Sequence, residues 1–132
     1  MQRFEIMSIE SSADVVLVRQ AVRQLAVELR FSLVDQTKIV TAASELARNT
    51  LTYGGGGTVK LETLEEDRRR GLRLTFEDQG PGIADIDLAL KDGFTTGNGL
   101  GMGLSGTKRL VNEFNIVSRV GEGTCITITK WK

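Results

Sequence analysis

The sequence contains no histidine and a single cysteine, Cys125. The absence of histidine excludes histidine-based nucleophilic or metal chemistry, and it excludes autophosphorylation on histidine within these 132 residues. One cysteine can form neither a disulfide within the chain nor a cysteine metal cluster. We therefore expect no disulfides and a reducing compartment.

The sequence also lacks an excess of either charge and any long apolar run. Lys and Arg together number 17, as do Asp and Glu, so no basic surplus favours nucleic-acid binding. No apolar stretch approaches the length of a membrane span, and the N-terminal residues lack the apolar core of a signal peptide. These features predict a cytoplasmic protein with no membrane or nucleic-acid partner.

Hydrophobic periodicity predicts five strands, two long helices and a shorter third helix. The strands are expected at 3–9, 59–63, 72–76, 116–120 and 125–131, the long helices at 12–30 and 35–51, and the third helix from about Gly101 with Leu104, Lys108, Val111 and Phe114 along one side. The mixed charges from Glu65 to Arg70 are expected in a solvated turn between strands. Because strands and helices do not alternate regularly, the order predicts an α+β fold. We expect one domain, residues 1–132, built as a two-layer sandwich in which about three helices cover a mixed, mainly antiparallel sheet.

A first motif lies on the second long helix, in the segment Glu45-Leu46-Ala47-Arg48-Asn49. Glu45 and Asn49 are four residues apart and share one helical face, which borders the apolar stripe. A carboxylate beside a carboxamide can bind Mg²⁺ and orient a hydroxyl group or a water molecule. Taken alone, however, the pair is better explained as part of a solvated helix face.

A second motif, Phe76-Glu77-Asp78-Gln79-Gly80-Pro81-Gly82-Ile83, follows the strand at 72–76. Its glycines allow the backbone to approach a ligand closely. Asp78 is a short acceptor at a strand end, and such a group suits an exocyclic amine like that of adenine. A Gly-Pro-Gly turn after an edge strand explains the segment about equally well.

A third motif runs from Gly97 to Leu104, with glycine at every second position up to Gly103, and leads into the third helix. Glycine-rich loops at helix N-termini bind phosphates through backbone N–H groups. The segment from Gly101 to Gly106 also matches G-x-G-x-x-G, but a loop precedes it where a dinucleotide-binding unit has an apolar strand. The Gly-Lys-Ser/Thr triplet of a P-loop is absent.

Together, in this order, the three motifs resemble the N box and the two glycine boxes of the GHKL (Bergerat-fold) ATPases and kinases. Gly123-Thr124 resembles a fourth element of that superfamily. Within it, the chain is similar over nearly its full length to anti-sigma-factor-like kinases, and most of all to the RsbT-type switch kinases of bacterial stress-signalling complexes. The segment Ser44 to Asn49, the segment Gly99 to Val111 and the terminal Lys130-Trp131 carry that similarity. One departure is Tyr53-Gly54, where many superfamily members have His or Lys.

The resemblance implies roles for individual residues. Asn49 would bind Mg²⁺ and the nucleotide, Glu45 would be the general base, and Asp78 would bind the adenine amine. Further cofactor-binding positions are expected around the adenine pocket, at Gly80, Gly82, Ile83 and Thr124, and along the phosphates, at Thr95, Thr96, Asn98, Gly99, Leu100, Gly101, Met102, Gly103 and Leu104. Residues 84–98 would form a lid over ATP. Lys108 and Arg109 would either neutralise phosphate charge or be surface partners of Glu113, the interpretation that we favour.

The same resemblance implies a function and its partners. The chain would use Mg²⁺ and ATP to phosphorylate a serine or threonine of a STAS-domain protein, and it would activate a downstream serine phosphatase when released. An alternative is an anti-sigma factor that sequesters a sigma subunit and phosphorylates its antagonist. A non-catalytic nucleotide-binding module is a third possibility, which the intact Glu45 and Asn49 oppose. A histidine-kinase fragment is disfavoured because no phosphoacceptor histidine is present.

Overall fold

The computed structural model describes residues 4–83, Ile86 and residues 103–132. Five strands and three helices are formed by these residues. In chain order they are β1 (Phe4–Ile9), α1 (Ser12–Glu28), α2 (Leu33–Thr52), β2 (Gly57–Glu66), β3 (Arg69–Asp78), α4 (Gly103–Arg109), β4 (Glu113–Arg119) and β5 (Gly123–Trp131). None of the helices described is long and apolar enough to cross a membrane.

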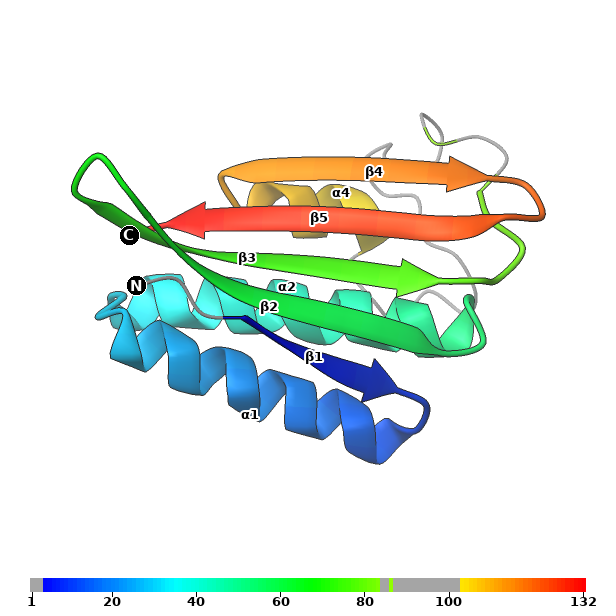
Figure 1. Ribbon diagram of the computed structural model, residues 1–132, viewed down its shortest axis with the longest axis horizontal. Coiled ribbons are helices and arrows are strands. Elements are labelled where there is room, and N and C mark those ends of the chain that lie inside the picture. The colour runs from blue at the N-terminus through cyan, green and yellow to red at the C-terminus, as the bar shows by residue number, and fades with distance from the viewer. Residues whose placement is uncertain (1–3, 84–85, 87–102) are drawn as a thin grey trace.

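The strands form one sheet in the order β1-β2-β3-β5-β4. Each of the four neighbouring pairs is antiparallel. Helices α2 and α4 lie behind this sheet in Figure 1, and α1 runs beside α2 below the β1 edge. The expected α+β sandwich with a mainly antiparallel sheet is confirmed, and among the residues described no parallel pair is present.

The core lies between the sheet and the two long helices. Alternate residues of the central strands face the helices, as the strict period of two requires. The fully buried side chains of this layer are Val59, Leu61, Leu72, Leu74, Phe76 and Ile128 from the sheet, and Val18, Val22, Ile39 and Leu46 from the helices. The expected buried positions of the second helix, Ile39, Ala43, Leu46 and Thr50, are all buried.

Both long helices begin at a serine that caps them. The Ser11 hydroxyl accepts a hydrogen bond from the Asp14 N–H, and the Ser32 hydroxyl accepts one from the Asp35 N–H. These bonds satisfy backbone donors that lack partners in the first helical turn. Helix α1 ends two residues earlier than expected, and Arg30 then takes a left-handed conformation with φ 64°.

The expected solvated turn between β2 and β3 is confirmed but is shorter than predicted, and one further local expectation was wrong. The hairpin between β2 and β3 turns at Asp67 and Arg68 alone, both with positive φ, so the flanking charged residues belong to the paired strands. Two adjacent residues of positive φ form the tight turn whose twist matches a hairpin. Phe114, expected on the third helix, lies in β4, because α4 already ends at Arg109.

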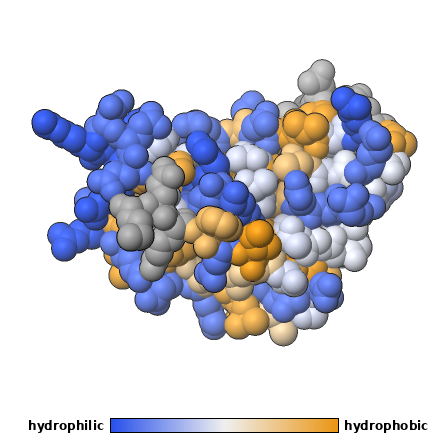
Figure 2. All heavy atoms as spheres, viewed as in Figure 1, coloured by the Kyte–Doolittle hydropathy of each residue, from blue (hydrophilic) through white to orange (hydrophobic). Residues whose placement is uncertain are grey.

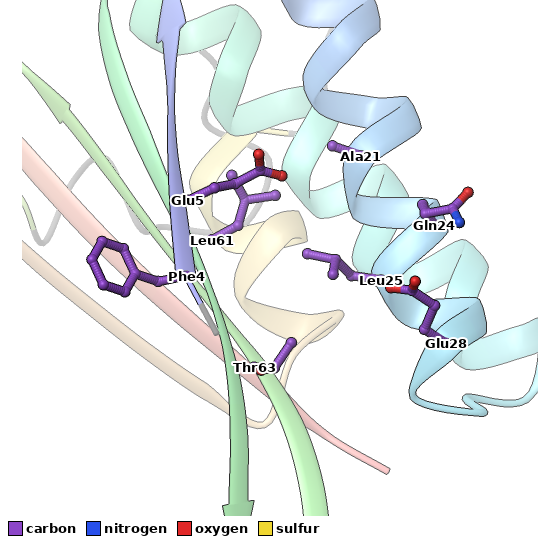
Figure 3. Close-up of a pocket in the computed structure, with 8 residues that line it drawn as sticks. All are labelled: Phe4, Glu5, Ala21, Gln24, Leu25, Glu28, Leu61 and Thr63. Atoms are coloured by element: carbon purple, nitrogen blue, oxygen red, sulfur yellow. The ribbon is translucent and has the colours of Figure 1, made fainter. Parts of the chain in front are cut away.

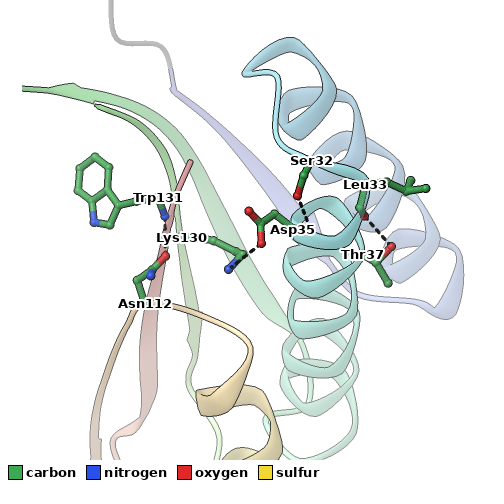
Figure 4. Close-up of polar contacts among 7 residues, drawn as sticks. All are labelled: Ser32, Leu33, Asp35, Thr37, Asn112, Lys130 and Trp131. Carbon is green, nitrogen blue, oxygen red and sulfur yellow. Dashed lines mark hydrogen bonds and ion pairs between the residues drawn. The ribbon is translucent and has the colours of Figure 1, made fainter. Parts of the chain in front are cut away.

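The end of the sheet where β5 finishes is joined to the start of α2 by an ion pair. Lys130 Nζ lies 3.5 Å from Asp35 Oδ1, and Lys130 is only 7% exposed. Figure 4 shows Lys130 pointing toward α2, whereas Trp131 points to the other side of the strand. The Trp131 N–H and indole N–H donate to Asn112 and Glu113, both at 2.7 Å. We call this end of the sheet, with Lys130, Trp131 and their partners, the far end.

No helix among the described residues covers the opposite face of the sheet. Thr75, Thr127 and Thr129 are neighbours across β3 and β5 on this face, and charged side chains lie around them. Figure 2 shows this side as mostly hydrophilic and intermediate residues, with apolar residues scattered between them. Such a surface is typical of an antiparallel sheet with one solvated face.

Candidate functional site

Asp78 ends β3 at the edge where three backbone segments meet. In the sheet register it lies opposite Gly57 of β2 on one side and Thr124 of β5 on the other. Its Oδ1 accepts a hydrogen bond of 2.9 Å from the Gly80 N–H. Asp78 is half-buried, so its carboxylate has a fixed orientation and remains open to a ligand. That Asp78 accepts from the amine of adenine stays a prediction.

The turn after β3 is fixed to the loop between β4 and β5. The Ile83 N–H donates to Ser118 Oγ at 2.8 Å, and the Gly121 N–H donates to the Pro81 carbonyl at 2.8 Å. Gly82 has φ +76° and touches the Arg119 carbonyl closely, so this position requires glycine for both conformation and space. Gly80, Gly82 and Ile83 are therefore held together, as expected for one pocket wall.

Thr124 forms a hydroxyl pair with Ser118, whose oxygen lies 2.7 Å from Thr124 Oγ1. Ser118 also donates to the Gly123 carbonyl at 3.1 Å. Sequence reasoning missed Ser118. No motif marks it, and it joins the site only because the register places it directly opposite Thr124. Its hydroxyl links the glycine turn to Thr124.

Glu45 lies on α2 and is more buried than expected. It is 9% exposed, although its face was predicted only to border the apolar stripe. Its Oε2 accepts a hydrogen bond of 3.1 Å from Arg48 Nη1, and the Arg48 side chain is 54% exposed. The arginine therefore holds one carboxylate oxygen and extends toward solvent.

Asn49 is half-buried one turn further along α2. The main-chain carbonyl of Asn49 accepts hydrogen bonds from the N–H groups of Tyr53 at 2.9 Å and Gly54 at 3.3 Å, where the helix ends. The chain then passes directly beside Asp78, because Gly54 packs against that side chain. Asn49 and Asp78 thus lie together at one end of the sandwich, which we call the site end, and Glu45 lies one helical turn before Asn49.

Gly103 and Leu104 begin α4. Gly103 has φ +73°, and its carbonyl accepts a hydrogen bond of 3.0 Å from Thr107. Leu104 is buried in the core, so its side chain packs inward. The other expected phosphate-binding residues, Thr95, Thr96, Asn98, Gly99, Leu100, Gly101 and Met102, lie outside the described residues.

The surface of the described part has several hollows, among them one of about 490 Å³ on the face of the sheet that no described helix covers, lined by residues that include Arg73, Thr75 and Thr127. Two others lie nearer the helices or the site end. One of about 180 Å³ lies at the site end and is lined by residues that include Asp78, Ser118, Thr124 and Cys125. Burial, reinforced by the Glu77 carboxylate, raises the pKa of the Cys125 thiol above its ordinary value. The other hollow, of about 450 Å³, lies between α1 and the β1–β2 edge (Figure 3), where Leu25 and Leu61 point toward each other.

Two chemical expectations can be compared with the charged side chains. The residues described contain no cluster of three or more Cys, Asp or Glu side chains that could hold a metal ion. A metal at the site end would therefore depend on oxygens besides the carboxylates of the described residues. The expected pairing of Lys108 and Arg109 with Glu113 stays a prediction; the one partner of Glu113 established among the described residues is the Trp131 indole, which donates to it.

Comparison with known families agrees with this geometry. Residues 34–132 match the model of the histidine kinase-, DNA gyrase B- and HSP90-like ATPases. The chain belongs to this ATPase family, and the matched range includes all three sequence motifs.

Comparison with individual relatives narrows the class. The chain is 50% identical over 118 residues to the serine/threonine-protein kinase RsbT of Bacillus subtilis, and the aligned region covers 89% of each chain. It is 31% identical over 119 residues to an anti-sigma F factor of Anoxybacillus flavithermus, covering 85% of this chain and 80% of that one. Within the ATPase family, the chain is therefore an RsbT-like serine/threonine kinase.

Solved structures confirm the fold. The RsbU and RsbW domains of a Mycobacterium tuberculosis protein superpose with a TM-score of 0.67 at 19% identity. The match covers all of this chain, which spans about one third (33%) of that longer chain. The SiaB–SiaC complex of Pseudomonas aeruginosa superposes with a TM-score of 0.56 at 10% identity, covering 97% of this chain and 89% of that one. At these identities the likeness concerns the fold alone.

Proposed function

We propose that this kinase uses Mg²⁺ and ATP to phosphorylate a serine or threonine of a STAS-domain protein in bacterial stress signalling. The observation that carries the proposal is that Asn49 and Asp78 lie together at the site end, with Glu45 one helical turn before Asn49. A base, a metal-binding amide and an adenine-binding acid are the three groups that such a reaction requires. Helix α2 supplies the first two, and β3 supplies the third.

Asp78 binds the adenine base in this proposal. One of its oxygens is fixed by the Gly80 N–H, and the other is available to accept a hydrogen bond from the 6-amino group of adenine. Guanine has a carbonyl oxygen at that position, which a carboxylate repels, so ATP is preferred over GTP. Gly82, Ile83 and the Ser118–Thr124 hydroxyl pair form the surrounding wall.

Glu45 accepts the proton of the acceptor hydroxyl. The hydroxyl oxygen bonds to the γ-phosphorus as the bond from that phosphorus to the ADP oxygen breaks. Because the transition state of such transfers is loose, positioning matters more than early proton removal. The ion pair with Arg48 supports this role, since it fixes one carboxylate oxygen of Glu45 and leaves the other to accept the proton.

Asn49 is the protein ligand for Mg²⁺. Its amide oxygen suits a hard cation that otherwise takes water and phosphate oxygens, which agrees with the lack of an acidic cluster in the described residues. The ion, when bound, neutralises charge on the phosphates. In this proposal the phosphate-binding positions carried over from the resemblance are Thr95, Thr96, Asn98, Gly99, Leu100, Gly101, Met102, Gly103 and Leu104, of which the structure describes only Gly103 and Leu104.

The identity to the Bacillus subtilis kinase supports protein serine/threonine phosphorylation. The resemblance to the RsbT-type switch kinases is what suggests a STAS-domain acceptor and, after release from it, a serine phosphatase regulator as a second partner. The anti-sigma F factor relatives favour the alternative, a factor that sequesters a sigma subunit and phosphorylates its antagonist. The higher identity to the stress kinase, 50% against 31%, favours the first assignment.

Capture of partners from cells of the source organism separates the two functions. The tagged chain should retain a STAS-domain protein or a phosphatase, and Mg²⁺ with ATP should release the STAS-domain protein as it becomes phosphorylated. Asn49→Ala, which removes the metal ligand, should keep the partner and lose Mg²⁺-dependent ATP binding in calorimetry. Retention of a sigma subunit without either partner would instead establish the alternative.

A further inference from the structure

Asp78 is confined by a glycine from another element. Gly54 follows the C-terminal cap of α2, and a methyl group added there would lie 2.5 Å from Asp78 Cβ and closer still to its Cγ. Real side-chain carbons do not approach this closely. Gly54 is not among the glycines with positive φ, so its position requires space and not an unusual backbone conformation.

Gly80 approaches the same point from the other side. A methyl group added at Gly80 would lie 2.7 Å from Gly54 Cα and 3.1 Å from Asp78 Oδ1. The two glycine backbones and the carboxylate are therefore packed together without room for another carbon atom. The Gly80 N–H that lies in this contact is also the donor to Asp78 Oδ1.

We infer that Gly54 is a positioning residue for adenine recognition, because it leaves the space in which the Asp78 carboxylate takes its binding orientation. The inference rests on the proposed adenine contact of Asp78. A side chain at position 54 would turn the carboxylate away from the Gly80 N–H or displace the end of α2. Since the Gly54 N–H donates to the Asn49 carbonyl, Gly54 also fixes the distance between the adenine-binding strand and the last turn of α2.

The experiment compares Gly54→Ala with Gly55→Ala. Gly55 is the matched control, because it has φ +74° and an added methyl group would meet nothing within 4 Å. Alanine there strains the loop and lowers stability without touching Asp78. Calorimetry with ATP and with GTP, both with Mg²⁺, measures binding, and denaturant unfolding measures stability.

Gly54→Ala should weaken ATP binding about tenfold or more, equivalent to ~1.4 kcal/mol, and reduce the preference for ATP over GTP. Gly55→Ala should leave both the affinity and the preference close to wild type. In an Asp78→Asn background, Gly54→Ala should cost little further affinity, because the two changes remove the same interaction. Gly80→Ala should repeat the Gly54→Ala result from the other side of the carboxylate.

Several results would overturn the inference. These are wild-type ATP affinity and nucleotide preference in Gly54→Ala, an equal loss in Gly55→Ala, or an undiminished cost in the Asp78→Asn background. If neither Gly54→Ala nor Gly80→Ala folds, the glycines serve the fold and the inference is wrong. If Asp78→Asn itself binds ATP with wild-type affinity, the proposed adenine contact of Asp78 is wrong as well. If Asp78→Asn weakens ATP binding and Gly54→Ala does not, that contact stands and only the inference about Gly54 is wrong.

Discussion

At the far end of the sheet, side chains from different elements contact one another, whereas at the site end two glycine backbones pack against a carboxylate and leave no room for a further carbon atom. Lys130 reaches across the layers to Asp35, and the Trp131 indole donates to Glu113. At the site end, Gly54 and Gly80 pack against each other and against Asp78. The far end is therefore sensitive to the removal of side-chain atoms, and the site end to their addition.

This difference separates stability from function along one helix. Helix α2 begins at the far end, with Asp35 in its first turn, and finishes at the site end with Asn49 in its last. Changes near the start of α2 should alter the free energy of unfolding with little effect on nucleotide affinity. Changes near its end should alter binding or transfer with a smaller effect on stability.

The largest effect is expected from Glu45→Gln. Phosphate transfer should fall by about 10²–10⁴-fold, the usual contribution of general acid–base catalysis, while ATP affinity stays nearly intact. Glu45 is 9% exposed and paired with Arg48, so a moderate loss of stability should accompany the change. Transfer at the wild-type rate in rapid-quench assays would show that Glu45 is not the base.

The next effect belongs to Asp78→Asn. The change keeps the shape but turns the acceptor partly into a donor, and ATP affinity should fall by about 10–100-fold, as for loss of a hydrogen bond to a charged group. The preference for ATP over GTP should fall with it. Calorimetry that returned wild-type values for both nucleotides would remove Asp78 from the site.

A smaller and different effect is expected at the far end. Asp35→Ala leaves the buried Lys130 ammonium without its partner and should lower the free energy of unfolding by roughly 1–3 kcal/mol. Lys130→Met removes the buried charge while keeping an apolar stem, so it should cost less than Asp35→Ala. Neither variant should change ATP affinity by more than about twofold, because substitutions at distant sites act almost independently. A large loss of ATP binding in Asp35→Ala would erase the distinction between the two ends.

The smallest effect concerns Cys125, beside the site-end hollow. Because its pKa is raised, the thiol stays neutral at pH values where a free cysteine begins to ionise, and the thiolate is the reactive form. Alkylation by iodoacetamide should be slower than that of the unfolded chain near pH 8 and should accelerate only at higher pH. Cys125→Ser should leave ATP binding unchanged. Rapid alkylation of the folded chain at neutral pH would contradict the raised pKa.

Much of the fold follows from the sequence, because local patterns determine it. The period of two in β2 and β3 needs no tertiary information. Phe114 was misassigned because its apolar spacing continues the helical pattern of Leu104, although α4 ends at Arg109. Helix ends depend on packing more than on periodicity.

The site was predictable only where a motif marks it. Asp78 and the glycines after it form a recognisable segment, and Glu45 and Asn49 share a helix face by spacing alone. The burial of Glu45 and its pairing with Arg48 depend on how α2 packs, which no local pattern specifies. Ser118 and the contact of Gly54 with Asp78 depend on strand register and on elements distant in sequence, so they emerge only from the structure.

The most direct test of the account is the intact mass of a purified STAS-domain protein from the same organism after incubation with this chain, Mg²⁺ and ATP. The account predicts one added phosphate on that protein, mapped by fragmentation to a serine or threonine, in amounts that Glu45→Gln nearly abolishes. The account would be contradicted if the STAS-domain protein stayed unmodified while the chain consumed ATP, or if Glu45→Gln gave the same yield of phosphorylated protein.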